Sequence, residues 1–147
     1  MSLSTSALLA KLCLGLLLLS CSKKEVIYKK EQMFEMAPHE GPDKIEIVLA
    51  RSINDAVPCT NYGEGCLSAH TLKTRGLGFI AVEFESAAQA EASAQKIYGY
   101  TTHNWLFDDV DGEPELERWV SKYFKVKSFN PKKQIKADAA KTPAQTE

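Results

Sequence analysis

Cysteines are the residues of this chain with the clearest potential chemistry. Cys13 lies inside an apolar run, Cys21 stands directly after that run, and Cys59 and Cys66 form a pair in CTNYGEGC. A thiol can be acylated, oxidised or bound to a metal ion, and its surroundings decide which. The four cysteines therefore fall into three settings, each with its own chemistry.

The apolar run LCLGLLLL lies near the start of the chain and follows a single basic residue, Lys11. Eight helical residues rise about 12 Å, whereas the hydrocarbon layer of a bilayer is about 30 Å thick, so the run is too short to span a membrane. It is typical of the apolar part of a signal peptide, which we predict over residues 1–20. A plain secretory cleavage site would carry small residues at the last and third-last positions, but here LLS precedes Cys21.

The sequence LLSC resembles the lipobox of bacterial lipoproteins. In that family the thiol receives a diacylglyceryl group, the preceding peptide bond is cut and the new amino terminus is usually acylated, and the resemblance assigns this role to Cys21. It implies a protein anchored in a bacterial envelope by two or three acyl chains. Ser22 resembles the sorting signal of outer-membrane cargo, which implies an outer-membrane protein facing the periplasm. The alternative is a buried cysteine in an ordinary short helix.

Export would place Cys59 and Cys66 in an oxidising compartment, and an even remainder of two cysteines in a glycine-bearing loop predicts one disulfide. In the loop-closure model so short a ring contributes about 2.5 kcal/mol to stability. A metal or redox pair is the competing interpretation, but six residues separate the two cysteines and His70 has no second partner at zinc-like spacing.

An acidic stretch, DDVDGEPELE, starts at Asp108 and brings together six carboxylates in ten residues. Its spacing is only partly that of a calcium loop, because Pro114 stands where glycine is needed and no glutamate occupies position twelve. Acidic residues are also favoured at the start of a helix, where the dipole stabilises them. The three histidines, His39, His70 and His103, form no recognisable catalytic motif with the serines, and no cofactor or metal site is predicted.

Composition indicates one ordinary domain. The chain is 44% hydrophobic and 25% charged. Without the first twenty residues it holds 17 basic and 19 acidic side chains, which gives no nucleic-acid signature. We expect a tether over residues 21–42, a domain over 43–130 and a disordered tail over 131–147.

The pattern of the central region predicts an α+β fold. Four strands are expected: a central strand in KIEIVLA from Lys44 and strands at 67–74, 77–85 and 102–110. Two helices are expected: one that Ser86 can cap and that ends with Gly99 at the C′ position, and a last one from about Pro114. The last helix carries an amphipathic stripe of Leu116, Trp119, Val120, Tyr123 and Phe124. We expect a small antiparallel sheet with helices on one face, a ferredoxin-like or related sandwich.

The stretch RGLGFIAV, Arg75 to Val82, followed by a helix, resembles the RNP1 strand of RNA-recognition motifs. This resemblance implies only that the strand and the following helix are arranged as in that family's fold. Positions that stack on RNA bases carry Leu77 and Val82 instead of aromatics, and KIEIVLA offers no aromatic residue, so RNA binding is not implied.

These features predict a lipid-anchored, non-catalytic interaction or assembly module rather than an enzyme. Its partner would be another envelope protein, bound through a sheet edge or an exposed aromatic patch of Tyr100, Trp105 and Phe107. The alternative is a periplasmic protein that binds a small ligand or a metal ion through the acidic stretch together with His103.

Overall fold

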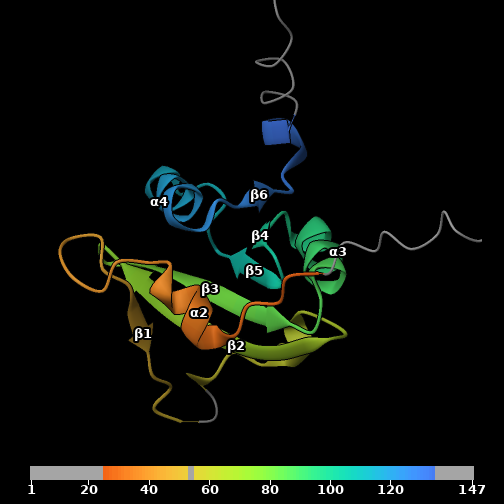
Figure 1. Ribbon diagram of the computed structural model, residues 1–147, viewed down its shortest axis with the longest axis horizontal. Coiled ribbons are helices and arrows are strands. Elements are labelled where there is room, and N and C mark those ends of the chain that lie inside the picture. Colours follow the sequence, from red (N-terminus) through yellow and green to blue (C-terminus); the bar gives the residue numbers. More distant parts are fainter. Residues whose placement is uncertain (1–24, 53–54, 135–147) are drawn as a thin grey trace, which may run out of the picture.

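The computed structural model describes residues 25–52 and 55–134. Figure 1 shows a twisted sheet with helices packed around it. In chain order the elements are α2 (Lys30–Glu35), β1 (Glu46–Val48), the 3-10 turn η2 (Cys59–Asn61), β2 (Cys66–Thr74), β3 (Leu77–Phe84), α3 (Ala87–Ile97), β4 (Tyr100–Thr102), β5 (Trp105–Asp108), α4 (Pro114–Phe124) and β6 (Lys127–Ser128).

Within these described residues the sheet has six strands in the order β1-β2-β3-β5-β4-β6, and every neighbouring pair is antiparallel. The β2–β3 hairpin turns at Arg75 and Gly76, both with positive φ, as a two-residue turn requires. Because β3 and β4 both run antiparallel to β5, they run parallel to each other and form a split β-α-β unit with α3. The predicted α+β class and small antiparallel sheet are confirmed.

The central strands are buried on both faces. On β3, Phe79 and Ala81 belong to one core cluster, whereas Val82 and Phe84 belong to another, as the alternation of a strand demands. The first cluster lies under α2 and α4, and the second lies under α3 and the cysteine loop. The helices therefore lie on both faces of the sheet instead of the one face expected, because two adjacent strands carry apolar side chains at consecutive positions.

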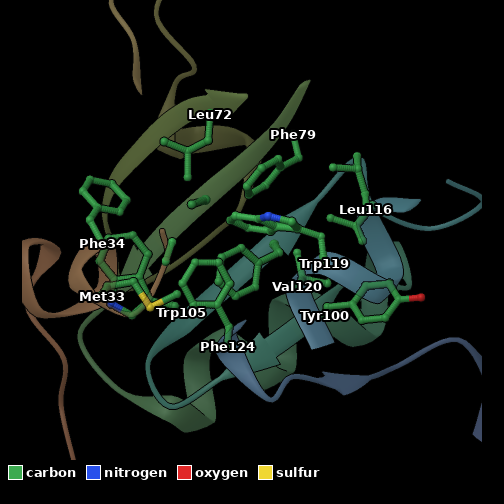
Figure 2. Packing of buried hydrophobic residues seen from close by; sticks show 14 residues of the cluster. Met33, Phe34, Leu72, Phe79, Tyr100, Trp105, Leu116, Trp119, Val120 and Phe124 are labelled. Atoms are coloured by element: carbon green, nitrogen blue, oxygen red, sulfur yellow. The ribbon is translucent and has the colours of Figure 1, made fainter. Parts of the chain in front are cut away.

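Aromatic rings fill the core under α4 (Figure 2). The ring of Phe124 stacks on that of Phe107, with centroids 4.8 Å apart, and Trp119 packs at 5.7 Å from Phe79. Leu116, Trp119, Val120 and Phe124 of α4 are all buried, which confirms four of the five residues of the predicted stripe; Tyr123 is half-buried. The indole Nε1 of Trp119 also donates to the carbonyl oxygen of Asp43 at 3.0 Å.

The segment before β1 packs on the sheet. Met33, Phe34 and Ala37 are buried in the core, and Figure 1 shows α2 lying across the strands. A helix of six residues is marginal by itself, so this burial is what stabilises α2. The predicted tether over 21–42 is therefore corrected within the described residues: the folded unit includes α2 and begins before residue 43.

Helix α3 begins as predicted, with the Ser86 hydroxyl oxygen accepting from the backbone N–H of Gln89. At its end the left-handed residue is Tyr98, with φ 58°, and not Gly99. Gly99 is needed for a different reason: a Cβ there would lie 2.5 Å from Leu106 Cδ1 and 3.2 Å from the carbonyl oxygen of Phe107. Its hydrogen lets the chain pass close to β5.

The strand expected at 102–110 is a hairpin instead. β4 and β5 are joined at His103 and Asn104, and His103 adopts a positive φ of 49°. Asn104 is fully buried, and its amide group holds the turn by donating to the carbonyl oxygen of Phe84 at 2.9 Å. Because no glycine lies in this turn, the sequence carried no signal that the expected strand is interrupted there.

Candidate interaction surface

Strand β1 is an open edge of the sheet. It pairs with β2 through Glu46, Ile47 and Val48, and among the described residues no strand pairs with its other side. Ile47 is 45% exposed and Val48 is 37% exposed, although they point to opposite faces. The expectation of a central strand is therefore wrong: the apolar run in KIEIVLA indicated burial on both faces, and the structure leaves both faces open to solvent.

The open edge continues onto β2. β1 covers only the stretch from Thr71 to Lys73, so the first part of β2 has no strand on that side in the described portion of the chain. Leu67 is 49% exposed there, and Leu49, directly after β1, is 81% exposed. A sheet edge presents unpaired backbone N–H and C=O groups that an added strand can satisfy.

Within β1 the charged side chain is that of Glu46, at the beginning of the strand, and the next exposed charged residue, Arg51, lies beyond the apolar residues 47–50. Lys44 forms an ion pair with Glu46 at 2.7 Å, and Lys73 lies opposite Glu46 on β2. Towards the other end the exposed side chains are apolar. The edge therefore combines an apolar stretch with a polar boundary, which is the composition of a protein-binding surface.

The predicted aromatic patch is not on the surface. Trp105 and Phe107 are fully buried and Tyr100 is only 4% exposed. The indole Nε1 of Trp105 donates to the carbonyl oxygen of Tyr28 at 2.8 Å. The expectation that these aromatics bind a partner is corrected, because helices on both faces bury consecutive residues of β5.

The acidic stretch is divided among several structural contacts. Asp108 accepts a hydrogen bond from the Tyr62 hydroxyl at 3.0 Å. Burial, and after it the charge and hydrogen bond of Asp108, raise the pKa of Tyr62. Burial and the neighbouring Asp108 raise the pKa of Asp109. Asp108 and Asp109 line a cavity of about 260 Å³ together with Tyr98 and Asp111.

Lys133 forms ion pairs with two other carboxylates of the acidic stretch. Its Nζ lies 2.6 Å from Asp111 and also contacts Glu117 and, at 2.8 Å, the Tyr100 hydroxyl. Burial opposes the charge of Lys133, but these partners outweigh it and raise its pKa. The chain is thus still bound to the domain three residues beyond the predicted boundary at 130.

His103 lies at the opposite end of β5 from the acidic stretch. Its ring packs at 4.3 Å from that of Tyr28. Within residues 25–52 and 55–134, no group of three or more His, Cys, Asp or Glu side chains is placed to hold a metal ion. The combination of His103 with the acidic turn is therefore not formed.

Ser68, His70 and Glu83 form a cluster that the sequence pattern did not indicate, although they share one face of β2 and β3. The Ser68 hydroxyl donates to Glu83 at 3.2 Å, and His70 Nε2 lies 3.1 Å from the Ser68 oxygen. The serine stands between the imidazole and the carboxylate, so the histidine is not oriented by the acid as in a nucleophilic triad. Burial is the main cause that lowers the pKa of His70; nearby Lys30 adds to this and Glu83 opposes it.

The cysteine pair is oxidised as predicted. Cys59 and Cys66 form a disulfide with their Cα atoms 5.5 Å apart. The closed loop carries Tyr62, which is buried against α3 and β5, and its carbonyl oxygen accepts from the buried Ser93 hydroxyl at 2.8 Å. The ring therefore fixes part of the cover on the α3 face of the sheet.

Asp43 is a further residue whose role the sequence pattern did not indicate. Its carboxylate accepts from the Tyr123 hydroxyl at 2.8 Å and pairs with Arg75 at 2.5 Å, and these contacts hold its pKa below the usual range. It joins the segment before β1 to α4 and to the β2–β3 turn. A single acidic residue before a strand carries no pattern that would announce this role.

Cys21 and Ser22 lie outside the described residues. Over the described part of the chain, no helix has both the length and the apolar character needed to cross a bilayer. Comparisons with protein families, with characterised proteins and with solved structures gave no match for this chain.

Proposed function

We propose that this chain is a lipid-anchored protein of a bacterial envelope that acts as a non-catalytic interaction module, binding another protein through the open β1 edge. The observation that carries the proposal is the exposure of apolar side chains on both faces of an edge strand. Natural sheet edges are commonly protected by charge, by proline or by a covering segment. β1 is short and carries a charge at Glu46, but the exposed Ile47 and Val48 that follow carry neither charge nor proline and are suited to a partner strand.

The anchor is supported by the LLSC sequence and by the cysteine pair. A disulfide fits an exported protein, because thiols in a reducing compartment remain reduced. Ser22 supports sorting to the outer membrane, with the domain in the periplasm. Replacing Cys21 with Ala should leave an unprocessed or freely soluble protein; a variant that stays in the membrane fraction with unchanged mass would refute the anchor.

Two contributions would stabilise binding at the edge: backbone hydrogen bonds to the partner and the burial of exposed apolar side chains. Each hydrogen bond contributes about 0.5–1.5 kcal/mol net, and burying exposed apolar surface contributes about 25 cal/mol per Å². The partner would supply an extended segment whose side chains cover Ile47 on one face and Val48 on the other. This geometry is the addition of a strand to a sheet.

Photo-crosslinking in intact cells tests the surface. A crosslinking amino acid at Val48 should capture one discrete partner, whereas the same residue at Ile97 should not. The two positions are a matched pair, since Val48 is 37% exposed and Ile97 is 38% exposed. Val48→Lys should abolish capture from a crosslinker at Ile47 with no change in melting temperature. Equal capture at Val48 and Ile97 would refute the edge as the binding surface.

Binding of a small ligand or metal ion by the acidic turn is the alternative. Asp111 and Glu117 already pair with Lys133, and within the described residues no three acidic side chains converge as ligands for a cation. Calcium should therefore leave the melting temperature unchanged. A rise that saturates with calcium, and that Asp109→Asn removes, would favour this alternative over the interaction module.

A further inference from the structure

We infer that the domain sits on the membrane with a defined end, the one that holds the β4–β5 turn and the junction of β3 with α3. This inference rests on the proposed lipid anchor at Cys21. The surface involved is called the proximal end here and consists of Val26, Ile27, Leu67, Glu85 and His103. Its occupant is the headgroup region of the bilayer that holds the anchor.

The first described residues are bonded to this end. The Glu25 carboxylate accepts from the backbone N–H of Ala87 at the start of α3. Three residues later, the backbone N–H of Tyr28 donates to the Asn104 side chain at 2.8 Å, and the Tyr28 carbonyl oxygen accepts from both Asn104 and Trp105. Figure 1 shows the chain entering the domain beside α3.

The other members of the proximal end come from different parts of the chain. The backbone N–H of Glu85 donates to the carbonyl oxygen of Gly65 at 2.9 Å, and Cys66 pairs with Phe84 across β2 and β3. Leu67 follows directly. The beginning of β2 therefore lies at the same end of the sheet as Glu25.

The distance to the anchor is short. Only three residues separate Cys21 from Glu25, so the four intervening Cα steps span at most about 14 Å. β2 has nine residues and is about 30 Å long. The anchor can therefore reach a bilayer beside the proximal end but cannot extend past the far end of the sheet.

The side chains at the two ends fit this orientation. Val26 is 54% exposed, Ile27 is 36% exposed and Leu67 is 49% exposed. At the opposite end the β2–β3 turn carries Arg75 and the segment after β5 carries Asp109, both exposed and charged, although Ile97 and Tyr98 at the end of α3 are also exposed there. An interfacial position lets the three apolar side chains leave water while the polar turns stay in it.

Depth-dependent fluorescence quenching tests the orientation with the full lipidated chain in phosphatidylcholine vesicles, some of whose lipids carry a nitroxide on the headgroup. Tryptophan would replace Leu67 in one variant and Tyr98, at the other end of α3, in its control. These positions are 49% and 52% exposed. Glu85→Trp serves as a second proximal variant if Leu67→Trp melts at a lower temperature than the unmodified protein.

After subtraction of the signal of the two native tryptophans, the proximal variants should lose emission to the nitroxide and shift to shorter wavelength, whereas Tyr98→Trp should do neither. Equal quenching of both kinds of variant, or none in the proximal ones, would overturn the orientation while leaving the anchor intact. Failure of the unmodified protein to float with the vesicles would overturn the anchor, and the orientation with it.

Discussion

Replacing Asn104 with Ala should release the N-terminal segment from the sheet. The Asn104 side chain is fully buried and makes three hydrogen bonds: it accepts from the Tyr28 N–H at 2.8 Å and donates to the carbonyl oxygens of Tyr28 and Phe84 at 3.2 and 2.9 Å. The substitution removes all three bonds, so the Tyr28 N–H and the buried Phe84 carbonyl oxygen lose this partner, whereas the Tyr28 carbonyl oxygen keeps its bond from the Trp105 indole. At about 1 kcal/mol for each bond, the expected loss is about 3 kcal/mol.

That loss is a large part of the stability of a small domain, which is about 5–15 kcal/mol. Urea denaturation followed by tryptophan fluorescence gives the free energy of unfolding, and hydrogen exchange gives the protection of residues 28–37. Both should fall in Asn104→Ala, with the loss of protection concentrated in the segment that holds Met33 and Phe34.

Asn130→Ala is the matched control. Its side chain also makes three hydrogen bonds, two to Asp111 and one from the backbone N–H of Lys132, but they lie at an exposed site. We expect a change within about 0.5 kcal/mol. The reasoning would be refuted if Asn104→Ala were as mild as Asn130→Ala, or if residues 28–37 kept their protection while the domain lost stability.

Three other expectations follow from buried groups. Trp119→Ala and Trp105→Ala should each lower the free energy of unfolding by about 3–5 kcal/mol, as cavity mutations; a mild effect at Trp105 would contradict its place in the core. Because the pKa of His70 is lowered from 6.5 in the folded state, the unfolded chain binds more protons at acid pH, so stability should fall as pH drops below 6.5, and the melting curves of His70→Gln should lack this step. Alkylation of purified protein without reductant should leave Cys59 and Cys66 unmodified, and two labelled thiols would count against the disulfide.

The elements best predicted from sequence are those whose pattern is local. The stripe of α4, the Ser86 cap and the Cys59–Cys66 pair each depend on residues close in the chain, and all three are formed. The pattern failed where neighbours far away in the chain decide the outcome. Trp105 and Leu106 point to opposite faces, and no local signal states that both faces are covered.

The candidate surface was predicted only in part. A sheet edge was one of two options, but KIEIVLA was placed in the middle of the sheet because an apolar run usually means burial on both sides. Strand order depends on pairing between distant segments, and nothing within Ile47 and Val48 reveals how many neighbours β1 has. Asp43 and Glu83 were missed for the same reason, since their partners lie on other elements.

The N-terminal segment has a consequence for the order of folding. Tyr28 bonds to Asn104 and Trp105, which lie 76 and 77 residues further along the chain. The Cys59–Cys66 ring, by contrast, closes over a separation of seven. Contacts at such long separation form late, because the loop between them must first be closed at a cost in entropy. Residues 28–37 are thus expected to dock among the last, although they precede the sheet in the chain, and until then Met33 and Phe34 remain exposed and prone to pair with other chains.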